Sequence, residues 1–173
     1  VLTYSISGAD AALFDIDPVT GAVTFKSAPN YEAPGDAGGN NVYDVNVTVS
    51  DGTNTATQAV AISVTDTDEA PIFTSGTAAS FAENASGTVY TAAATDPDAG
   101  STITYSIAGA DAALFDINAT TGAITFKSSP NYEAPGDAGG DNVYDVIVSA
   151  TDGVNVTTNA VAITVTNVNE APT

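Results

Sequence analysis

Clusters of carboxylate side chains are the feature of this sequence best able to carry chemistry. The chain has 21 Asp and Glu residues, two basic residues, and neither histidine nor cysteine. Three of the carboxylates, Asp66, Asp68 and Glu69, fall within four residues ahead of Pro71. Such close like charges repel one another, so the cluster needs either free hydration or a bound cation. Hard cations such as Ca²⁺ prefer oxygen ligands of this kind.

The balance of charge and the missing residue types exclude several classes of protein. A formal net charge of −19 excludes a nucleic-acid binder, which needs basic side chains to neutralise phosphates, and argues against docking on anionic membranes. Without cysteine and histidine, zinc, haem and iron–sulfur sites are effectively ruled out. No apolar run is long enough for membrane insertion. Paired carboxylates could serve a glycosidase, but no apolar cleft or raised-pKa acid is indicated. We therefore predict that the protein is not an enzyme.

A domain-sized repeat organises the chain. Residues 1–71 align without a gap on residues 102–172, and 50 of the 71 positions are identical. Residues 72–101 have no counterpart in the first copy. We therefore expect residues 1–71 to be a partial module that lacks its first two strands. Residues 72–173 should form one complete module that ends in the next linker.

Short alternating segments indicate β-strands throughout both copies. Apolar and polar residues alternate in 2–6 and again in 43–49, as in half-buried strands. Between such segments lie turn sequences, including a hairpin turn at 51–54 and a stretch at 8–12 that could close one helical turn. About seven such strands per hundred residues predict an all-β fold, a seven-stranded Greek-key β-sandwich in tandem modules.

Within one module, further oxygen-bearing side chains fall between the predicted strands. They are Glu83, Asp96, Asp98, Asn131, Glu133 and Asp152. Because Ca²⁺ takes six to eight oxygens and no single loop here supplies them, these side chains must converge from several loops. Asp and Asn are also ordinary turn residues, and Asp152 before glycine is weak evidence by itself. Glu133 is better evidence, since Glu is a poor turn former and the preceding Tyr132 is expected to pack inward.

The set of motifs resembles a cadherin repeat (a cadherin/Ig-like sandwich), of the kind found in tandem in large secreted bacterial (RTX-type) adhesins. Glu83-Asn84 resembles the family's first-strand Glu motif, and Asp96-Pro97-Asp98 resembles its D-x-D motif. Asn131-Tyr132-Glu133 stands where the family has D-R-E or D-Y-E, and Ala150-Thr151-Asp152-Gly153 resembles A-x-D-x. The hinge Asp66 to Pro71 resembles the family's acidic linker. The sequence departs from the family at Asn30 and Asn131, and at Asn167 and Asn169 in the C-terminal hinge, where the family has aspartates.

The resemblance implies Ca²⁺ ions between successive modules. The implied ligands at the internal hinge are Asn30, Glu32, Asp66, Asp68, Glu69, Asp96, Asp98 and Asp152. A second set would serve a following module: Glu83, Glu133, Asn167, Asn169 and Glu170. Because two of those are asparagines, we expect the two hinges to bind Ca²⁺ unequally. Asp36, Asp137 and Asp141 could hold a separate ion in a Gly-rich loop (Pro34 to Asn41 and Pro135 to Asn142) that the pattern of animal cadherins lacks.

The resemblance therefore implies a calcium-rigidified spacer or adhesion module, extracellular or on a cell surface. Its partners would be the neighbouring cadherin-like modules of the same chain, other copies of itself, or a cell-surface glycan or protein. Two alternatives stay open. One is a module that binds a glycan or protein ligand, although most aromatic residues fall at inward-facing positions. The other is a subunit of a self-assembling extracellular filament.

Overall fold

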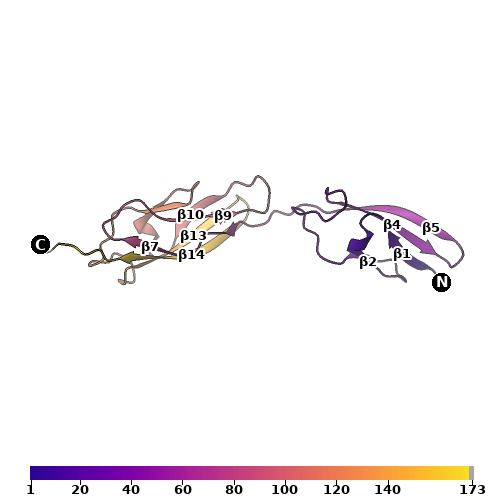
Figure 1. Ribbon diagram of the computed structural model, residues 1–173, viewed down its shortest axis with the longest axis horizontal. Coiled ribbons are helices and arrows are strands. Elements are labelled where there is room, and N and C mark those ends of the chain that lie inside the picture. The colour runs from indigo at the N-terminus through magenta and orange to yellow at the C-terminus, as the bar shows by residue number, and fades with distance from the viewer. Residues whose placement is uncertain (172–173) are drawn as a thin grey trace. The chain divides into compact units, whose positions relative to one another are not determined.

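The structure, a computed structural model, describes residues 1–171 and divides into two compact units. Unit 1 comprises Val1–Thr67 and unit 2 begins at Asp68. Figure 1 shows that both units are built from strands. The only helices within residues 1–171 are two single 3₁₀ turns, η1 (Ala11–Leu13) and η2 (Ala112–Leu114). No helix in this range is long and apolar enough to cross a membrane.

Unit 2 is a sandwich of two sheets with a short additional ribbon. The first sheet has the order β10 (Thr104–Ala108), β13 (Val143–Thr151), β14 (Val156–Thr166) and β7 (Ala78–Ala82). The second has the order β11 (Phe115–Ile117), β12 (Ala123–Phe126) and β8 (Thr88–Thr91). The ribbon pairs β6 (Ile72–Phe73) with β9 (Ala94–Thr95). Neighbouring strands are antiparallel except β7, which runs parallel to β14.

The core of unit 2 lies between the two sheets, where the alternating apolar residues meet. Val148 on β13, Ile163 on β14 and Ile124 on β12 are fully buried. In this core, Phe126 packs against Phe115 in a tilted arrangement with ring centroids 4.3 Å apart, and it makes an edge-on contact with Tyr144 at 5.0 Å. This alternation is the burial pattern that a sandwich imposes on strands of period two.

Unit 1 repeats the second part of this architecture in the same register. Its larger sheet has the order β1 (Thr3–Ser7), β4 (Val42–Ser50) and β5 (Thr55–Ser63), and its smaller sheet pairs β2 (Phe14–Ile16) with β3 (Val23–Phe25). Tyr4 pairs with Val49 just as Tyr105 pairs with Ala150. The core of unit 1 is correspondingly small, with Phe14, Tyr43 and Val45 buried at its centre.

A buried aspartate fixes the Gly-rich loop in each unit. Asp111, which is 3% exposed, accepts the backbone N–H of Ala138 and of Asp145, both at 2.7 Å. It therefore ties the loop to the start of β13. Asp10 makes the equivalent bonds to Ala37 and Asp44. Satisfying both oxygens of a buried carboxylate removes most of the cost of burying it.

The all-β sandwich predicted from the alternation is confirmed. Its first strand is divided into β6 and β7, which pair with different strands, and its second into β8 and β9. The helical turn expected near residue 12 forms as η1. One expectation is wrong: Tyr132 does not pack inward but is 38% exposed, and Tyr31 is 39% exposed. Tyr43 on β4 and Tyr144 on β13 are buried instead.

Candidate metal centre

Five of the predicted ligands come together at the end of unit 2 where the chain enters. We call Asp68, Glu69, Asp96, Asp98 and Asp152 the entry cluster. Asp68 and Glu69 precede β6, the next two follow β9, and Asp152 lies in the hairpin between β13 and β14. The backbone N–H of Glu69 donates to Asp98 Oδ2 at 2.9 Å, and the two side chains have carboxylate oxygens within 4.8 Å of each other. The fold thus gathers carboxylates from three separate loops.

Two carboxylate oxygens of the entry cluster are buried without a hydrogen-bond donor. Asp96 Oδ1 accepts the N–H of Asp98 at 2.9 Å, and Asp152 Oδ1 accepts that of Asn155 at 2.7 Å. Among the described residues, Asp96 Oδ2 and Asp152 Oδ2 have no partner. A buried acceptor without a partner costs about 1–3 kcal/mol, and more when it is charged. These oxygens fit a hard cation, which would supply the missing partner.

The pKa of Asp68 also reflects the negative charge of the entry cluster. Although Asp68 lies at the surface, loss of hydration around its carboxylate raises its pKa, and the charges of Asp152, Asp98 and Asp96 raise it further. Its neighbours therefore disfavour its ionised form. A cation among these carboxylates would reverse that effect, because an opposite charge favours ionisation.

Two side chains that the sequence did not single out fasten the entry segment to unit 2. Asn155 donates its side-chain amide to Asp68 Oδ2 at 2.6 Å and to the Asp68 carbonyl at 3.0 Å. The Thr157 hydroxyl donates to the carbonyl of Pro71 at 2.7 Å. Both donors lie just past the hairpin turn. Nothing in their local pattern signals a partner more than 80 residues earlier.

Three glutamates form a second cluster at the other end of unit 2, where the chain leaves. Glu83, Glu133 and Glu170, which we call the exit cluster, have carboxylate oxygens within 4.8 Å of one another. Glu83 is only 2% exposed and accepts the backbone N–H of Val168 and of Tyr132, each at 2.8 Å. These two bonds, that of Val168 first, hold the pKa of Glu83 below its usual value.

Asparagines contribute to the exit cluster as donors. Asn84 donates to Glu170 Oε1 at 2.5 Å, and Asn167 donates to Glu133 Oε1 at 2.8 Å. Asn84 has a φ of 59°, a left-handed conformation that Asn tolerates well. Asn169, also predicted as a ligand, is an exposed hinge residue. Pro172, predicted to close this hinge, lies outside the described residues.

Unit 1 contains three of the predicted ligands, Asn30, Glu32 and Asp66. Glu32 and Asp66 have carboxylate oxygens within 4.8 Å of each other. Asn30 Oδ1 accepts the N–H of Glu32 at 2.8 Å and of Ala33 at 3.2 Å, and Asn131 makes the same turn in unit 2. These two asparagine oxygens therefore shape the turns that position the glutamates.

The carboxylates of the Gly-rich loop are engaged by backbone donors. Asp137 Oδ1 and Oδ2 accept the N–H groups of Asn142 and Asp141, and Asp36 makes the equivalent bonds in unit 1. Asp141 Oδ1 accepts the N–H of Val143, a bond that Asn40 makes equally well in unit 1. The separate ion expected in this loop remains a prediction, and the bonds seen here already account for these side chains.

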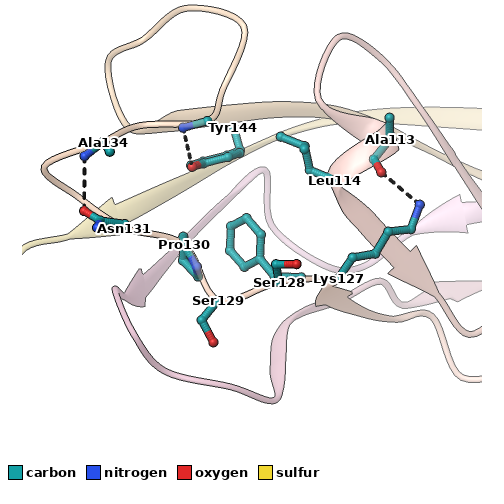
Figure 2. Close-up of a pocket in the computed structure, with 11 residues that line it drawn as sticks. Ala113, Leu114, Lys127, Ser128, Ser129, Pro130, Asn131, Ala134 and Tyr144 are labelled. Carbon is teal, nitrogen blue, oxygen red and sulfur yellow. Dashed lines mark hydrogen bonds between the residues drawn. The ribbon is translucent and has the colours of Figure 1, made fainter.

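One pocket recurs at the equivalent place in both units. In unit 2 it has a volume of about 310 Å³ and is lined by Leu114, Phe126, Lys127, Pro130 and Tyr144, among others (Figure 2). The equivalent pocket of unit 1 has a volume of about 440 Å³. The two lysines of the chain, Lys26 and Lys127, both line these pockets. Each ammonium group donates to a carbonyl of the neighbouring 3₁₀ turn at 2.8 Å.

Comparisons with known proteins agree with this arrangement. Residues 77–169, more than half of the chain, match the model of the cadherin domain family. The human protocadherin-24 EC1-2 structure (Form II) is 27% identical, with a TM-score of 0.64 over 96% of this chain and 82% of that chain. Mouse cadherin-23 EC22-24 is 24% identical, with a TM-score of 0.60 over 96% of this chain and 53% of that chain. Drosophila N-cadherin EC1-4 is 22% identical, with a TM-score of 0.61 over 97% of this chain and 41% of that chain.

The last two structures support the fold alone, because their identity is low. A search of curated protein sequences found no match. The family match, the cadherin-like sandwich and the acidic side chains at the module ends are consistent with one another. This chain belongs to the cadherin domain family.

Proposed function

We propose that the chain is a calcium-binding, calcium-rigidified spacer or adhesion module of a secreted or cell-surface bacterial adhesin. The observation that carries the proposal is the pair of buried, unpartnered oxygens of Asp96 and Asp152 in the entry cluster. They belong to carboxylates whose charges help to raise the pKa of Asp68. A bound cation would supply a partner for the two oxygens and would offset the repulsion that helps to raise the pKa of Asp68.

The ligands that we propose for the internal hinge come from both units. Unit 2 would contribute the entry cluster, and unit 1 would contribute the side chains near its last strand, Asn30, Glu32 and Asp66. Only Thr67 separates Asp66 from Asp68, so these two carboxylates and Glu69 belong to one continuous linker. Sharing ions between residues of two modules would restrict the angle between those modules. The ligand residues would thereby convert a flexible joint into a stiff one.

The expected affinity suits an extracellular role. Extracellular calcium modules bind with dissociation constants of about 10⁻⁴–10⁻³ M. Millimolar Ca²⁺ outside a cell would therefore load such sites, while a resting cytosol would not. At a free concentration about 100 times the dissociation constant, each site adds roughly 2.7 kcal/mol to the free energy of unfolding. That is a useful fraction of the stability of a typical domain.

Partners and location follow as parts of the same proposal. The neighbouring cadherin-like modules of the same chain would be the first partners, and further copies of the protein or a cell-surface glycan or protein would be adhesive ones. No nucleic-acid contact or membrane insertion is proposed. Cadherin domains are generally not enzymes, and we propose no catalytic activity here.

A thermal melt of the chain with Ca²⁺ and with chelator tests the proposal. We expect a higher melting temperature and a narrower range of small-angle scattering dimensions with Ca²⁺. The double variant Asp96→Asn/Asp152→Asn should lose both responses while keeping the fold, because each Oδ1 can still accept its backbone N–H. Equal melting temperatures and equal dimensions in the two buffers would refute the proposal.

The pocket favours a second candidate function, the binding of a glycan or protein ligand. The observation that favours it is the recurrence of the pocket in both units with a lysine in its wall. Largely apolar pockets with a few polar groups are typical ligand sites. Glycan-array binding by the chain at fixed Ca²⁺, lost on Lys26→Gln/Lys127→Gln substitution, would support this candidate. An array without any bound glycan would leave only protein ligands for the pocket.

A further inference from the structure

Each carboxylate of the exit cluster already has a hydrogen-bond donor from the protein. Backbone N–H groups serve both oxygens of Glu83, while Asn84 serves Glu170 and Asn167 serves Glu133. In the entry cluster, Asp96 and Asp152 also accept backbone N–H groups, but each has a second, buried oxygen without a donor, whereas both oxygens of the buried Glu83 are bonded. The two clusters are both rich in carboxylates, but only the entry cluster has buried oxygens that a cation would supply with a partner.

The chain contains its own comparison for Asn167. In unit 1 the equivalent pair is Glu32 and Asp66, two carboxylates with oxygens within 4.8 Å of each other. In unit 2 the pair is Glu133 and Asn167, joined by a hydrogen bond of 2.8 Å. Replacing one carboxylate by an amide turns a repulsive pair into a bonded one. The same position of the repeat thus places two carboxylates close together in unit 1, and a carboxylate bonded to an amide in unit 2.

These bonds are not ordinary turn contacts. Asn167 reaches a glutamate 34 residues earlier in the chain, and Asn84 reaches one 86 residues later. Asparagines that only shape turns bond to backbone groups two or three residues away, as Asn131 does with Glu133 and Ala134. Asn84 and Asn167 instead span the exit cluster.

We propose that Asn84 and Asn167 set the cation response of the exit cluster, making it a contact that forms without Ca²⁺ while the entry cluster requires it. The proposal rests on the proposed function only for the response of the entry cluster. Calcium affinity depends on the number of charged ligands, and the exit hinge carries neutral Asn167 and Asn169 where the internal hinge carries Asp66 and Asp68. The internal hinge and the exit hinge would then differ in their dependence on Ca²⁺.

A residue-resolved Ca²⁺ titration of the ¹⁵N-labelled chain by NMR tests the proposal. The amides of Tyr132 and Val168 report on the exit cluster, because both donate to Glu83. The amides of Glu69 and Asn155 report on the entry cluster, because they donate to Asp98 and Asp152. We expect the entry signals to shift with a midpoint at least about tenfold lower in Ca²⁺ than the exit signals. Equal midpoints in the unmodified chain would overturn the proposal.

The variant Asn167→Asp restores the residue type of unit 1. We expect it to lower the melting temperature in chelator, since the introduced carboxylate would repel Glu133, and to strengthen the Ca²⁺ response of the exit signals about tenfold. Asn118→Asp is the matched control, because it adds the same charge in an exposed turn where unit 1 already has Asp17. Equal exit responses in the two variants would overturn the proposal.

The design separates this proposal from the proposed function. Entry signals that do not respond to Ca²⁺ in any variant would refute the calcium-rigidified hinge. In that case a gain of exit response in Asn167→Asp alone would still support the role of the asparagine. The absence of that gain would refute both.

Discussion

The side-chain amide of Asn155 bonds to the Asp68 carboxylate at 2.6 Å, across 87 positions of the chain. This bond and a second one to the Asp68 carbonyl at 3.0 Å hold the entry segment against the hairpin that carries Asp152. The Asp68 carboxylate keeps further lone pairs with which it could bind a cation. Asn155 therefore positions a proposed ligand without being one.

We predict that Asn155→Ala weakens Ca²⁺ binding at the entry cluster about tenfold, the size of effect that residues supporting a metal ligand commonly have. Isothermal titration of the chain with Ca²⁺ measures it. The matched control is Asn54→Ala, which removes the asparagine from the same hairpin position of unit 1, where its side-chain amide bonds locally to Asp51. An unchanged affinity in Asn155→Ala would show that the bond does not position Asp68.

Asp68 should behave oppositely with and without a cation. Its raised pKa means that the fold disfavours its charge, so its protonation stabilises the fold, and this stabilisation is lost as pH rises through the pKa in the folded state. We predict that Asp68→Asn raises the melting temperature in chelator by about 1–3 °C and reduces the additional rise that Ca²⁺ produces. Scanning calorimetry in both buffers measures the two effects. A lower melting temperature in chelator would contradict the prediction.

Glu83 predicts a pH dependence of the opposite sign. Its backbone donors hold its pKa below the ordinary value of 4.5, so its contribution to stability is complete above that value. The contribution is lost as pH falls through the lower pKa of the folded state. We predict that Glu83→Gln flattens the loss of stability below about pH 4.5. Denaturant unfolding of both proteins between pH 3 and pH 6 provides the measurement, with Glu32→Gln, at an exposed glutamate of unit 1 outside the exit cluster, as the control.

Gly122 tests the packing between the strands. A Cβ at this position would lie 2.3 Å from the carbonyl oxygen of Ala92, and its φ is +70°. We predict that Gly122→Ala lowers the free energy of unfolding by more than about 2 kcal/mol, because both the contact and the backbone oppose it. Gly140, with a φ of +68° and open space around it, is the matched control for the backbone strain. Equal losses for Gly122→Ala and Gly140→Ala would mean that the contact contributes nothing.

The fold could be predicted because its signals are local. Alternation along 43–49 and the turn at 51–54 gave β4, β5 and the hairpin between them, since a strand with one buried face repeats every two residues. The division of the first strand into β6 and β7 could not be predicted. It depends on which strands lie beside each half, β9 and β14, and those partners are distant in the sequence.

The carboxylates of the candidate site could be predicted from the sequence, but the asparagine side chains that bond to them could not. Asp96 and Asp152 could be anticipated because carboxylates in several loops suggest one shared cation. Asn84, Asn155 and Asn167 escaped as donors, because an asparagine near a turn looks the same whether it shapes the turn or spans two loops. The exposure of Tyr132 could not be predicted either, because the aromatic cluster of the core is already formed by Phe115, Phe126 and Tyr144, which come from strands elsewhere in the chain.

The parallel pairing of β7 with β14 also determines how unit 2 would respond to a pulling force. Five residue pairs join these strands, from Ala78 with Ala162 to Ala82 with Thr166. The chain enters unit 2 ahead of β7 and leaves after β14, so tension along the chain pulls the two parallel strands in opposite directions. All the hydrogen bonds between them are then loaded in shear and must break together, instead of opening one after another. The strand pair acts as a mechanical clamp at the point where tension enters and leaves the module.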